Sequence, residues 1–365
     1  MRRSIDQFWQ QIVGLFSRTS ETSLYYIVED ANWSTDWDGH YITKGVSEQF
    51  DLDAQITTFP SKARGQIIHY GSLWSFVAGI NSKINRRNGI VTTIFHGNRD
   101  TALPALAEGV ELLIAHADQN DRIVTSCSIM QKRLVSWGIP ADKVVCIPLG
   151  VDTEIFKPTA SKEQEDLRVQ LGIPRDAFVI GSFQKDGNGW EEGLTPKLIK
   201  GPDIFLKVIE QVTRQHKVFV LLSGPARGYV KQGLEKMGVP YYHEFLDNYL
   251  DIVPLYHCLD AYLVPSREEG GPKGILEALA TGVPLVSTRV GLAPDVIDDG
   301  ANGLLADLED VDQLAKHISN LIKNAELGRR LVTAGLETIP AYDWNNIARQ
   351  YYEGVYKPLL DEIEK

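Results

Sequence analysis

One stretch of the sequence places Glu269, Lys273, Glu277 and several glycines at a spacing that suits a bound phosphate. This stretch runs from residue 264 to residue 282. A run of apolar residues that predicts a strand ends near residue 264. Pro272 is expected to open a helix of about ten residues, because proline needs no hydrogen-bond donor at that position. Gly282 follows the helix end, where glycine commonly stops helices. The amides at the start of such a helix lack intrahelical partners and attract anions.

Lys273 adds a positive charge at the expected helix start, and Glu277 lies about 7–8 Å further along the axis. The rest of this helix is apolar, so a carboxylate in it needs hydrogen-bond donors. The spacing suits a ribose whose diphosphate is held at the helix start. Each glutamate also has a simpler structural interpretation. Glu277 could lie on a narrow edge of the helix that faces solvent, and Glu269 could be an ordinary acidic residue of a surface loop. Three glycines would let a ligand approach the backbone closely, namely Gly270, Gly271 and Gly274.

Short apolar runs alternate with helical segments along the chain, which predicts parallel strands joined by crossover helices. The expected strands are 24–28, 66–69, 90–95, 112–115, 122–126, 143–147, 178–183, 218–223, 261–265 and 284–288. The expected helices include 128–137, 202–214, 230–237 and 272–281. Prolines and a glycine between residues 147 and 158 indicate a linker. The prediction is therefore an α/β protein with two doubly wound domains facing each other across a cleft, where ligands bind at carboxyl strand ends.

Composition narrows the classes of function. The 365 residues carry a net charge of −11, so DNA or RNA is not expected as a partner. The cysteines are an odd, unpatterned set that predicts neither disulfides nor a zinc site, but free thiols in a cytosolic protein. They are Cys127, Cys146 and Cys258.

The first 18 residues show apolar positions at helical spacing with arginines on both sides. The favoured interpretation is a helix that docks on the protein's own body. The alternative is peripheral contact with the inner face of a membrane through residues 1–18. No other segment approaches the length of a membrane span.

Glu269 and Glu277 form a Glu-x7-Glu pair, and with its flanking residues this segment resembles the donor-binding signature of the retaining GT-B glycosyltransferases of family 4. Further stretches resemble the same family, and the likeness extends from about residue 60 to the end of the chain. These stretches are 93–97, 124–152, 282–288, 298–305 and 343–352.

The resemblance implies a role for each matching residue. Glu269 would bind hydroxyls of the donor sugar, and Glu277 would bind the ribose. His96 would contact the donor sugar near the reacting carbon. Without the resemblance, the favoured interpretation of His96 is a histidine at a strand end whose hydrogen bonds are made within the protein. The amides of 270–274 would hold sugar hydroxyls and the diphosphate. The implied domains are 1–155, completed by a C-terminal helix at 341–365, and a donor-binding domain at 156–340.

The chain departs from the family in two places. The family usually has an arginine and then a lysine after the first strand of its second domain, but here no arginine follows the strand at 178–183. Lys200 is the candidate for the lysine, and either Lys185 or Lys273 could replace the arginine as a point charge. The inserted residues 187–199 could form a lid over the donor or part of the acceptor site, and the sequence favours neither. The family's glycine pair after the first strand is also missing, and Gly39 is the candidate for that close approach.

The implied reaction needs no cofactor and no metal, because cations and amides stabilise the charge that develops on the leaving diphosphate. The Asp-x-Asp at residues 51–53 is interpreted as a polar turn and not as a metal site. The partners are a nucleotide sugar and an acceptor that the sequence does not identify. Base, sugar and oligomeric state are likewise undetermined.

Two alternatives keep the same fold but change the function. The first is a non-catalytic module that binds a sugar, a nucleotide or a partner, favoured by the missing arginine. The second is a GT-B-fold epimerase of sugar nucleotides. A dinucleotide-dependent oxidoreductase is disfavoured, because no G-x-G-x-x-G joins a first strand to a helix.

Overall fold

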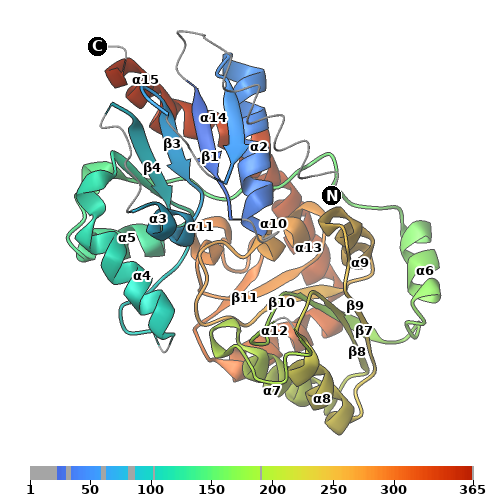
Figure 1. Ribbon diagram of the computed structural model, residues 1–365. Helices are drawn as coiled ribbons and strands as arrows, with labels where there is room; N and C mark the ends of the chain where they lie inside the picture. Colours follow the sequence, from blue (N-terminus) through green and yellow to red (C-terminus); the bar gives the residue numbers. More distant parts are fainter. Residues whose placement is uncertain are drawn as a thin grey trace.

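Two parallel sheets of six strands each organise the protein (Figure 1). The structure is a computed structural model that describes residues 23–29, 34–58, 63–80, 87–101, 103–189 and 191–363. The helix expected within residues 1–18 lies outside the described residues. Among the helices that are described, none has the length and apolarity needed to cross a membrane.

The first sheet has the strand order β2-β1-β3-β4-β5-β6. All of its neighbouring strands are parallel, with Leu24 opposite both Ala54 and Ile67. Its strands are β1 (Leu24–Ile27), β2 (Ala54–Thr57), β3 (Ile67–Tyr70), β4 (Gly89–Thr93), β5 (Arg122–Thr125) and β6 (Val144–Cys146).

The second sheet has the order β12-β11-β10-β7-β8-β9 and is also parallel throughout. Its strands are β7 (Phe178–Phe183), β8 (Val218–Ser223), β9 (Tyr241–Glu244), β10 (Ala261–Val264), β11 (Leu285–Thr288) and β12 (Leu304–Ala306). Each sheet with its covering helices is called a lobe below. The prediction of two doubly wound α/β units is confirmed.

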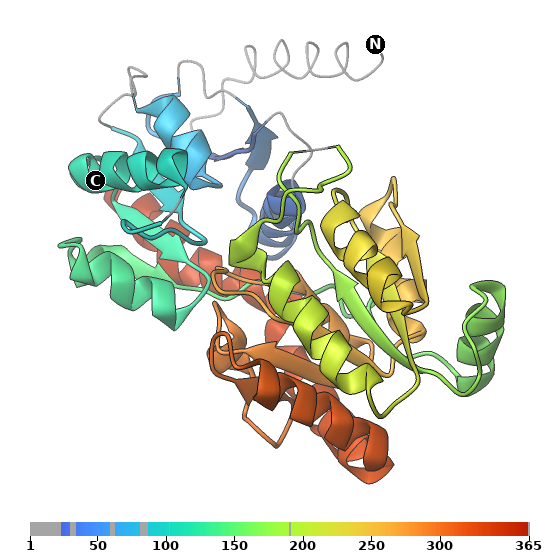
Figure 2. The same cartoon turned by 90° about the horizontal axis from the view of Figure 1, so that it is seen from below.

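Helices cover both faces of each sheet, and Figure 2 shows the two helical layers from below. The first lobe contains α2 (Ser34–Phe50), α3 (Leu73–Gly79), α4 (Pro104–Ala115) and α5 (Ser128–Ser136). The second lobe contains α6 (Ser161–Gln170), α7 (Pro202–Thr213), α8 (Gly228–Met237), α9 (Val253–His257), α10 (Lys273–Ala280), α11 (Ala293–Val296), α12 (Val311–Lys323) and α13 (Ala325–Thr338).

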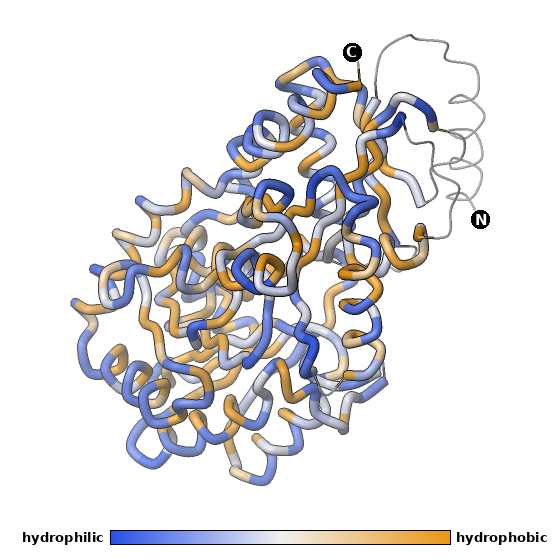
Figure 3. The backbone as a smooth tube through the Cα atoms, turned by 90° about the vertical axis from the view of Figure 1, so that its left-hand side faces the viewer, coloured by the Kyte–Doolittle hydropathy of each residue, from blue (hydrophilic) through white to orange (hydrophobic). Residues whose placement is uncertain are grey.

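Strand residues of the second sheet alternate between two apolar cores, as the period of two in a strand requires. On β8, Val220 and Leu222 pack into a core with α7, α8 and α12, while Phe219 and Leu221 face a second core. That second core includes α10 and continues into the first lobe. Figure 3 shows apolar segments along the inner strands and hydrophilic ones on the outer turns. The two lobes therefore share part of their buried surface.

The chain returns to the first lobe at its C-terminal end (Figure 1). The Trp344 ring stacks on Tyr41 of α2 at 5.1 Å, and the Phe50 and Tyr352 rings stack at 4.0 Å. The backbone of Val151, in the connection between lobes, pairs with residues 342–344. The elements are α14 (Trp344–Tyr351), the π-helical turn η6 (Tyr352–Tyr356) and α15 (Lys357–Ile363).

Several local predictions need correction. The strand expected at 112–115 is wrong, because these residues form the last turn of α4, where a longer apolar face packs on the core. The edge strands β2, β9 and β12 were not predicted. They are three or four residues long, and the two that are half-exposed lack a continuous apolar run. The residues 51–53 do form a connection, between α2 and β2.

His69 of β3 is buried without a charged partner. Its Nδ1 atom lies 2.7 Å from the Tyr356 hydroxyl and its Nε2 atom 2.7 Å from the Thr93 hydroxyl. Burial lowers the pKa of His69 to about 3. The imidazole is therefore neutral in the folded protein, whereas in the unfolded chain it titrates near pH 6.5.

This difference predicts a specific pH dependence of stability. Below about pH 6.5, His69 binds a proton in the unfolded state but not in the folded state. The free energy of unfolding therefore falls as the pH drops toward 3. The contribution is at most about 1.4 kcal/mol per pH unit. Urea unfolding of the wild type and His69→Gln at pH 7, 6 and 5 measures it. The variant should lose stability less steeply with acid, and parallel slopes would contradict the assignment.

Candidate functional site

The stretch between β10 and α10 lies where the two lobes meet. β10 ends at Val264, and α10 begins at Lys273 with Pro272 as the residue before its first turn. Pro272 was expected to be the first helical residue, so the helix starts one residue later than predicted. The carbonyl oxygen of Pro272 accepts a hydrogen bond from the amide of Ile275. The amides of Lys273 and Gly274 lie in the first turn of the helix, where no preceding turn supplies an acceptor.

Glu269 is paired with Lys200, one of the predicted site residues. The Lys200 ammonium lies 2.5 Å from Oε2 of Glu269, and the Ser266 hydroxyl donates to Oε1 at 3.0 Å. The Glu269 side chain is only 8% exposed, so it is not an ordinary surface acid. Gln184, after β7, donates to the Lys200 carbonyl at 3.0 Å and fixes the backbone there.

Glu277 lies in the middle of α10 and is buried, at 4% exposure. The hydroxyls of Tyr249 and Tyr256 each donate to one of its carboxylate oxygens. Burial raises the pKa of Glu277, and the two tyrosines and Lys273 oppose that rise. The solvent-facing alternative is therefore wrong. Each carboxylate oxygen accepts about two hydrogen bonds, so capacity remains for further donors.

His96 follows β4 and approaches this site from the first lobe. Burial lowers its pKa to about 4, with further lowering by Lys200 and an opposing contribution from Glu269. The imidazole is therefore neutral near pH 7. Its Nδ1 atom is enclosed and has no hydrogen-bond partner among the described residues. A neutral imidazole with an unused ring nitrogen can donate to or accept from a ligand hydroxyl.

Lys273 links the lobes. Its ammonium lies 2.6 Å from Oδ1 of Asp38 on α2 and 5.6 Å from the centre of the Tyr249 ring. Trp37, beside Asp38, packs on the same ring at 5.6 Å. Burial raises the pKa of Asp38, and Lys273 opposes this. A diphosphate would have to compete with Asp38 for Lys273.

The glycines before α10 are approached by protein atoms. A methyl group at Gly270 would lie 2.1 Å from the carbonyl oxygen of Phe95, in the first lobe. One at Gly271 would lie 2.5 Å from Leu149, and one at Gly274 would lie 2.4 Å from the Tyr262 hydroxyl. We predicted that these glycines leave room for a ligand. In this structure Phe95 and Leu149 approach Gly270 and Gly271 closely, and Tyr262 of the second lobe approaches Gly274.

Gly39, the candidate for close backbone approach after the first strand, lies within a helix. It is within α2, and a methyl group there would lie 2.8 Å from the ring of Tyr26. The helix α2 begins at Ser34 and packs against β1. Gly39 therefore serves helix–sheet packing, and no observation connects it with a ligand.

Lys197 is a site residue that the sequence analysis missed. It is half-buried, and its charge interacts with Lys200, Glu269 and Lys185. Burial lowers the pKa of Lys197, and Lys200 adds to this. Lys185, a predicted site residue, also has a pKa lowered by burial. One sequence feature could have indicated Lys197. This lysine lies three residues before Lys200, which is followed by Gly201 and Pro202 at the start of a helix.

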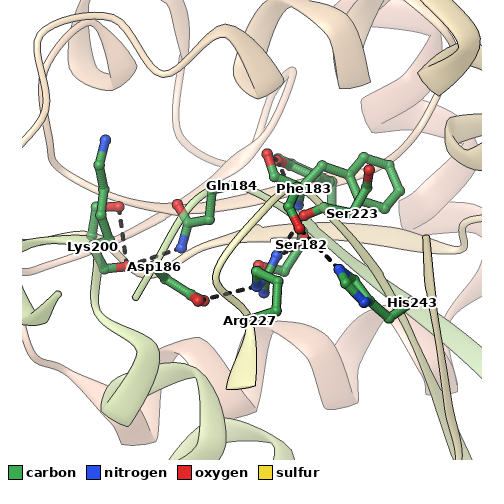
Figure 4. A network of polar contacts seen from close by, with 11 residues as sticks. Ser182, Phe183, Gln184, Asp186, Lys200, Ser223, Arg227 and His243 are labelled. Atoms are coloured by element: carbon green, nitrogen blue, oxygen red, sulfur yellow. Dashed lines mark hydrogen bonds and ion pairs between the residues drawn. The ribbon is translucent and has the colours of Figure 1, made fainter. Parts of the chain in front are cut away.

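A buried ion pair joins Asp186, which follows β7, to Arg227 (Figure 4). Nε of Arg227 lies 3.1 Å from Asp186, and their side chains are 0% and 1% exposed. The guanidinium also donates to the carbonyls of Ser182 and Ser223, at 2.5 and 2.9 Å. Burial raises the pKa of Asp186, and Arg227 opposes this. The two residues are 41 positions apart, so sequence spacing gave no sign of the pair.

Contacts between the lobes continue beside the site. The Arg133 guanidinium on α5 lies 3.6 Å from Glu268 and donates to the Gly97 carbonyl at 2.5 Å. Asp295 of α11 accepts from the amide of Ser128 at 2.7 Å and from its hydroxyl. In the described part of the chain, no three His, Cys, Asp or Glu residues are grouped to hold a metal ion.

Comparisons with known sequences agree with this geometry. Residues 193–324 match the family model for glycosyl transferases group 1. The chain is 28% identical over 254 residues to a D-inositol 3-phosphate glycosyltransferase of Saccharomonospora viridis, covering 65% of this chain and 54% of that protein. It is 25% identical to D-inositol 3-phosphate glycosyltransferase 1 of Catenulispora acidiphila, covering 74% and 65%. The chain spans about half the length of the first of these relatives.

Solved structures define the class of fold. HepE of Anabaena in complex with UDP-glucose superposes with a TM-score of 0.75 at 18% identity, over 92% of this chain and 100% of that one. A glycosyltransferase from Rickettsia africae gives 0.71 at 16% identity, over 94% and 99%. The two lobes therefore form a GT-B fold. The match to glycosyl transferases group 1, over residues 193–324, lies inside the second lobe.

The buried ion pair generates a stability prediction. Asp186→Asn leaves the enclosed Arg227 guanidinium without a counter-charge and should lower the free energy of unfolding by about 3–5 kcal/mol. Urea unfolding at pH 7 measures the loss. Asp176→Asn is the control, because Asp176 pairs with Lys217 on the surface and its removal should change stability little. Equal effects of the two substitutions would show that the buried pair has no special role.

Proposed function

We propose that this protein transfers a glycosyl group from a nucleoside diphosphate sugar to an acceptor hydroxyl, with retention of anomeric configuration. The observation that carries the proposal is the group of residues gathered at the start of α10. There Glu269 and Lys200 are paired beside His96, and the buried Glu277 lies further along the same helix.

Each group fits one part of such a donor. Glu269 and neutral His96 offer hydrogen bonds to sugar hydroxyls near the reacting carbon. Glu277 keeps acceptor capacity beyond the two tyrosine hydroxyls, which suits the ribose. The amides of Lys273 and Gly274, in the first turn of α10, suit the diphosphate. The relevant surfaces meet at the carboxyl ends of both sheets, where doubly wound proteins bind ligands.

The chemical step requires stabilisation of the negative charge that develops on the leaving diphosphate. Lys200 and the helix-start amides supply this stabilisation without proton transfer, and Lys185 lies near Lys197 to add charge. The acceptor oxygen attacks the anomeric carbon from the side on which the diphosphate leaves, so the configuration is retained. The bond from this carbon to the phosphate oxygen breaks, and the departing phosphate oxygen takes the proton of the acceptor hydroxyl. No protein nucleophile and no metal take part in this proposal.

A non-catalytic nucleotide-binding module is the second candidate. It is favoured by the engagement of Lys273 with Asp38 and of Glu277 with two tyrosines, which leaves fewer groups ready for a substrate. Binding without turnover is the outcome that would select it.

Nucleotide binding is the first prediction to test. UDP, GDP and ADP, each with its glucose conjugate, are added in thermal unfolding experiments. A ligand at 100 times its dissociation constant adds about 2.7 kcal/mol of stability. One base should raise the melting temperature, and Glu277→Gln should abolish the rise. Glu210→Gln, at an exposed position of α7, is the control and should keep it. No rise with any nucleotide would contradict the proposal.

The transfer itself is tested with the donor that binds. UDP-glucose is the first donor to try because HepE binds it, and D-inositol 3-phosphate is the first acceptor because the curated relatives are named for it. NMR of the product should show the anomeric configuration of the donor. An inverted product would contradict the proposed mechanism, and absence of product with every acceptor would favour the binding module.

A further inference from the structure

Two tyrosines hold the carboxylate of Glu277, and they differ in how far they are enclosed. Tyr256 lies on α9 and is completely buried, and its hydroxyl donates to Oε2 of Glu277 at 2.7 Å. Tyr249 is the first residue of the 3-10 turn η4 (Tyr249–Ile252), and its hydroxyl donates to Oε1. Tyr249 is partly exposed. Of the two donors, Tyr249 is therefore the one that borders the surface from which a ligand arrives.

The ring of Tyr249 is contacted by three separate parts of the chain. The Lys273 ammonium at the start of α10 lies 5.6 Å from the ring centre. The ring of Trp37, on α2 of the first lobe, lies at 5.6 Å, and the ring of Phe156, in the connection between the lobes, lies at 6.0 Å. Cation–ring and ring–ring contacts at such distances are attractive. The Tyr249 ring is therefore held from both lobes while its hydroxyl stays on Glu277.

The hydrogen bond from Tyr249 affects both the direction and the charge of the Glu277 carboxylate. A donor on each oxygen fixes the plane of the carboxylate, and the remaining acceptor positions then point in set directions. Burial raises the pKa of Glu277, and the bond from Tyr249 is the largest of the interactions that oppose this rise. Tyr249 therefore favours the ionised form, which keeps all its positions as acceptors.

We propose that Tyr249 is a positioning residue that orients Glu277 toward the ribose hydroxyls of the donor. Tyr249 acts through the carboxylate and thereby sets the preference of the site for ribonucleotides over nucleotides that lack these hydroxyls. The inference rests on the proposed function and adds to it the residue that determines specificity for the sugar of the nucleotide. The ligand class is a nucleoside diphosphate whose ribose carries both hydroxyls.

The test compares each nucleoside diphosphate with its 2′,3′-dideoxy analogue. UDP, GDP, ADP and the three analogues are titrated calorimetrically into the wild type and Tyr249→Phe. A hydrogen bond to a charged group is worth about 10- to 100-fold in affinity, so the wild type should prefer the ribose form by about that factor. Tyr249→Phe should reduce this preference by about 10-fold. Affinity for the dideoxy form should not change, because phenylalanine retains the ring beside Lys273.

Tyr241→Phe is the matched control, because it also removes a hydroxyl that donates to a glutamate. Tyr241 lies on β9 and donates to Glu235 at 2.7 Å, at an exposed place. This variant should keep the wild-type preference. Trp37→Leu gives a second measurement, since it removes a ring that packs on Tyr249 but leaves both hydroxyls on Glu277 in place. It should lower the preference in the same direction. Thermal unfolding without ligand confirms that each variant is folded.

Two results would overturn the positioning role while the proposed function stands. One is a wild-type preference for the ribose form in Tyr249→Phe, and the other is an equal loss of affinity for both forms, which indicates a general structural effect. If the wild type binds none of the diphosphates, the proposed function and the role of Tyr249 are both refuted.

Discussion

The carboxyl ends of two parallel sheets face each other in this protein, and the rest of the site depends on that arrangement. Phe95 follows β4 and Gly270 follows β10, yet their backbones approach so closely that no side chain fits between them. Asp38 on α2 pairs with Lys273 at the start of α10. Parallel strands place all their carboxyl ends at one edge, so two such edges bring loops from distant parts of the chain together.

Desolvation explains why the charged groups of the site come in pairs. Glu269 has Lys200, Asp38 has Lys273, and Asp186 has Arg227. A carboxylate removed from water needs a counter-charge or several donors, and breaking such a pair leaves an uncompensated charge. Glu277 is satisfied differently, by two tyrosine hydroxyls.

The packing between the lobes shows a compact arrangement with little space before α10. Gly270 and Gly271 contact the first lobe, and the C-terminal helices continue this contact through the stacked rings of Tyr41 and Trp344. The shared apolar core joins both lobes behind the site. A donor diphosphate that reaches the amides of α10 therefore replaces contacts between the lobes, and the Asp38–Lys273 pair is among those it competes with.

The sequence by itself determined the α/β class, the longer strands β7 and β8, and the start of α10 to within one residue. Apolar runs, proline and glycine are local signals, and local signals suffice for such elements. The same signals failed where context decides. Residues 112–115 have an apolar run that fits a strand, but they continue α4. Gly39 has loop-like neighbours, but it lies inside α2.

Only the tertiary structure decided which charges meet. The sequence predicted Glu269, Glu277 and Lys200 as site residues, but it did not predict that Glu277 is held by Tyr249 and Tyr256. It could not place Lys197, because the position of that lysine depends on the bridge between Gly187 and Pro196 and on an ion pair between residues 41 positions apart. Coulombic and hydrogen-bonding partners are set by distance in space, and periodicity along a chain carries no information about it.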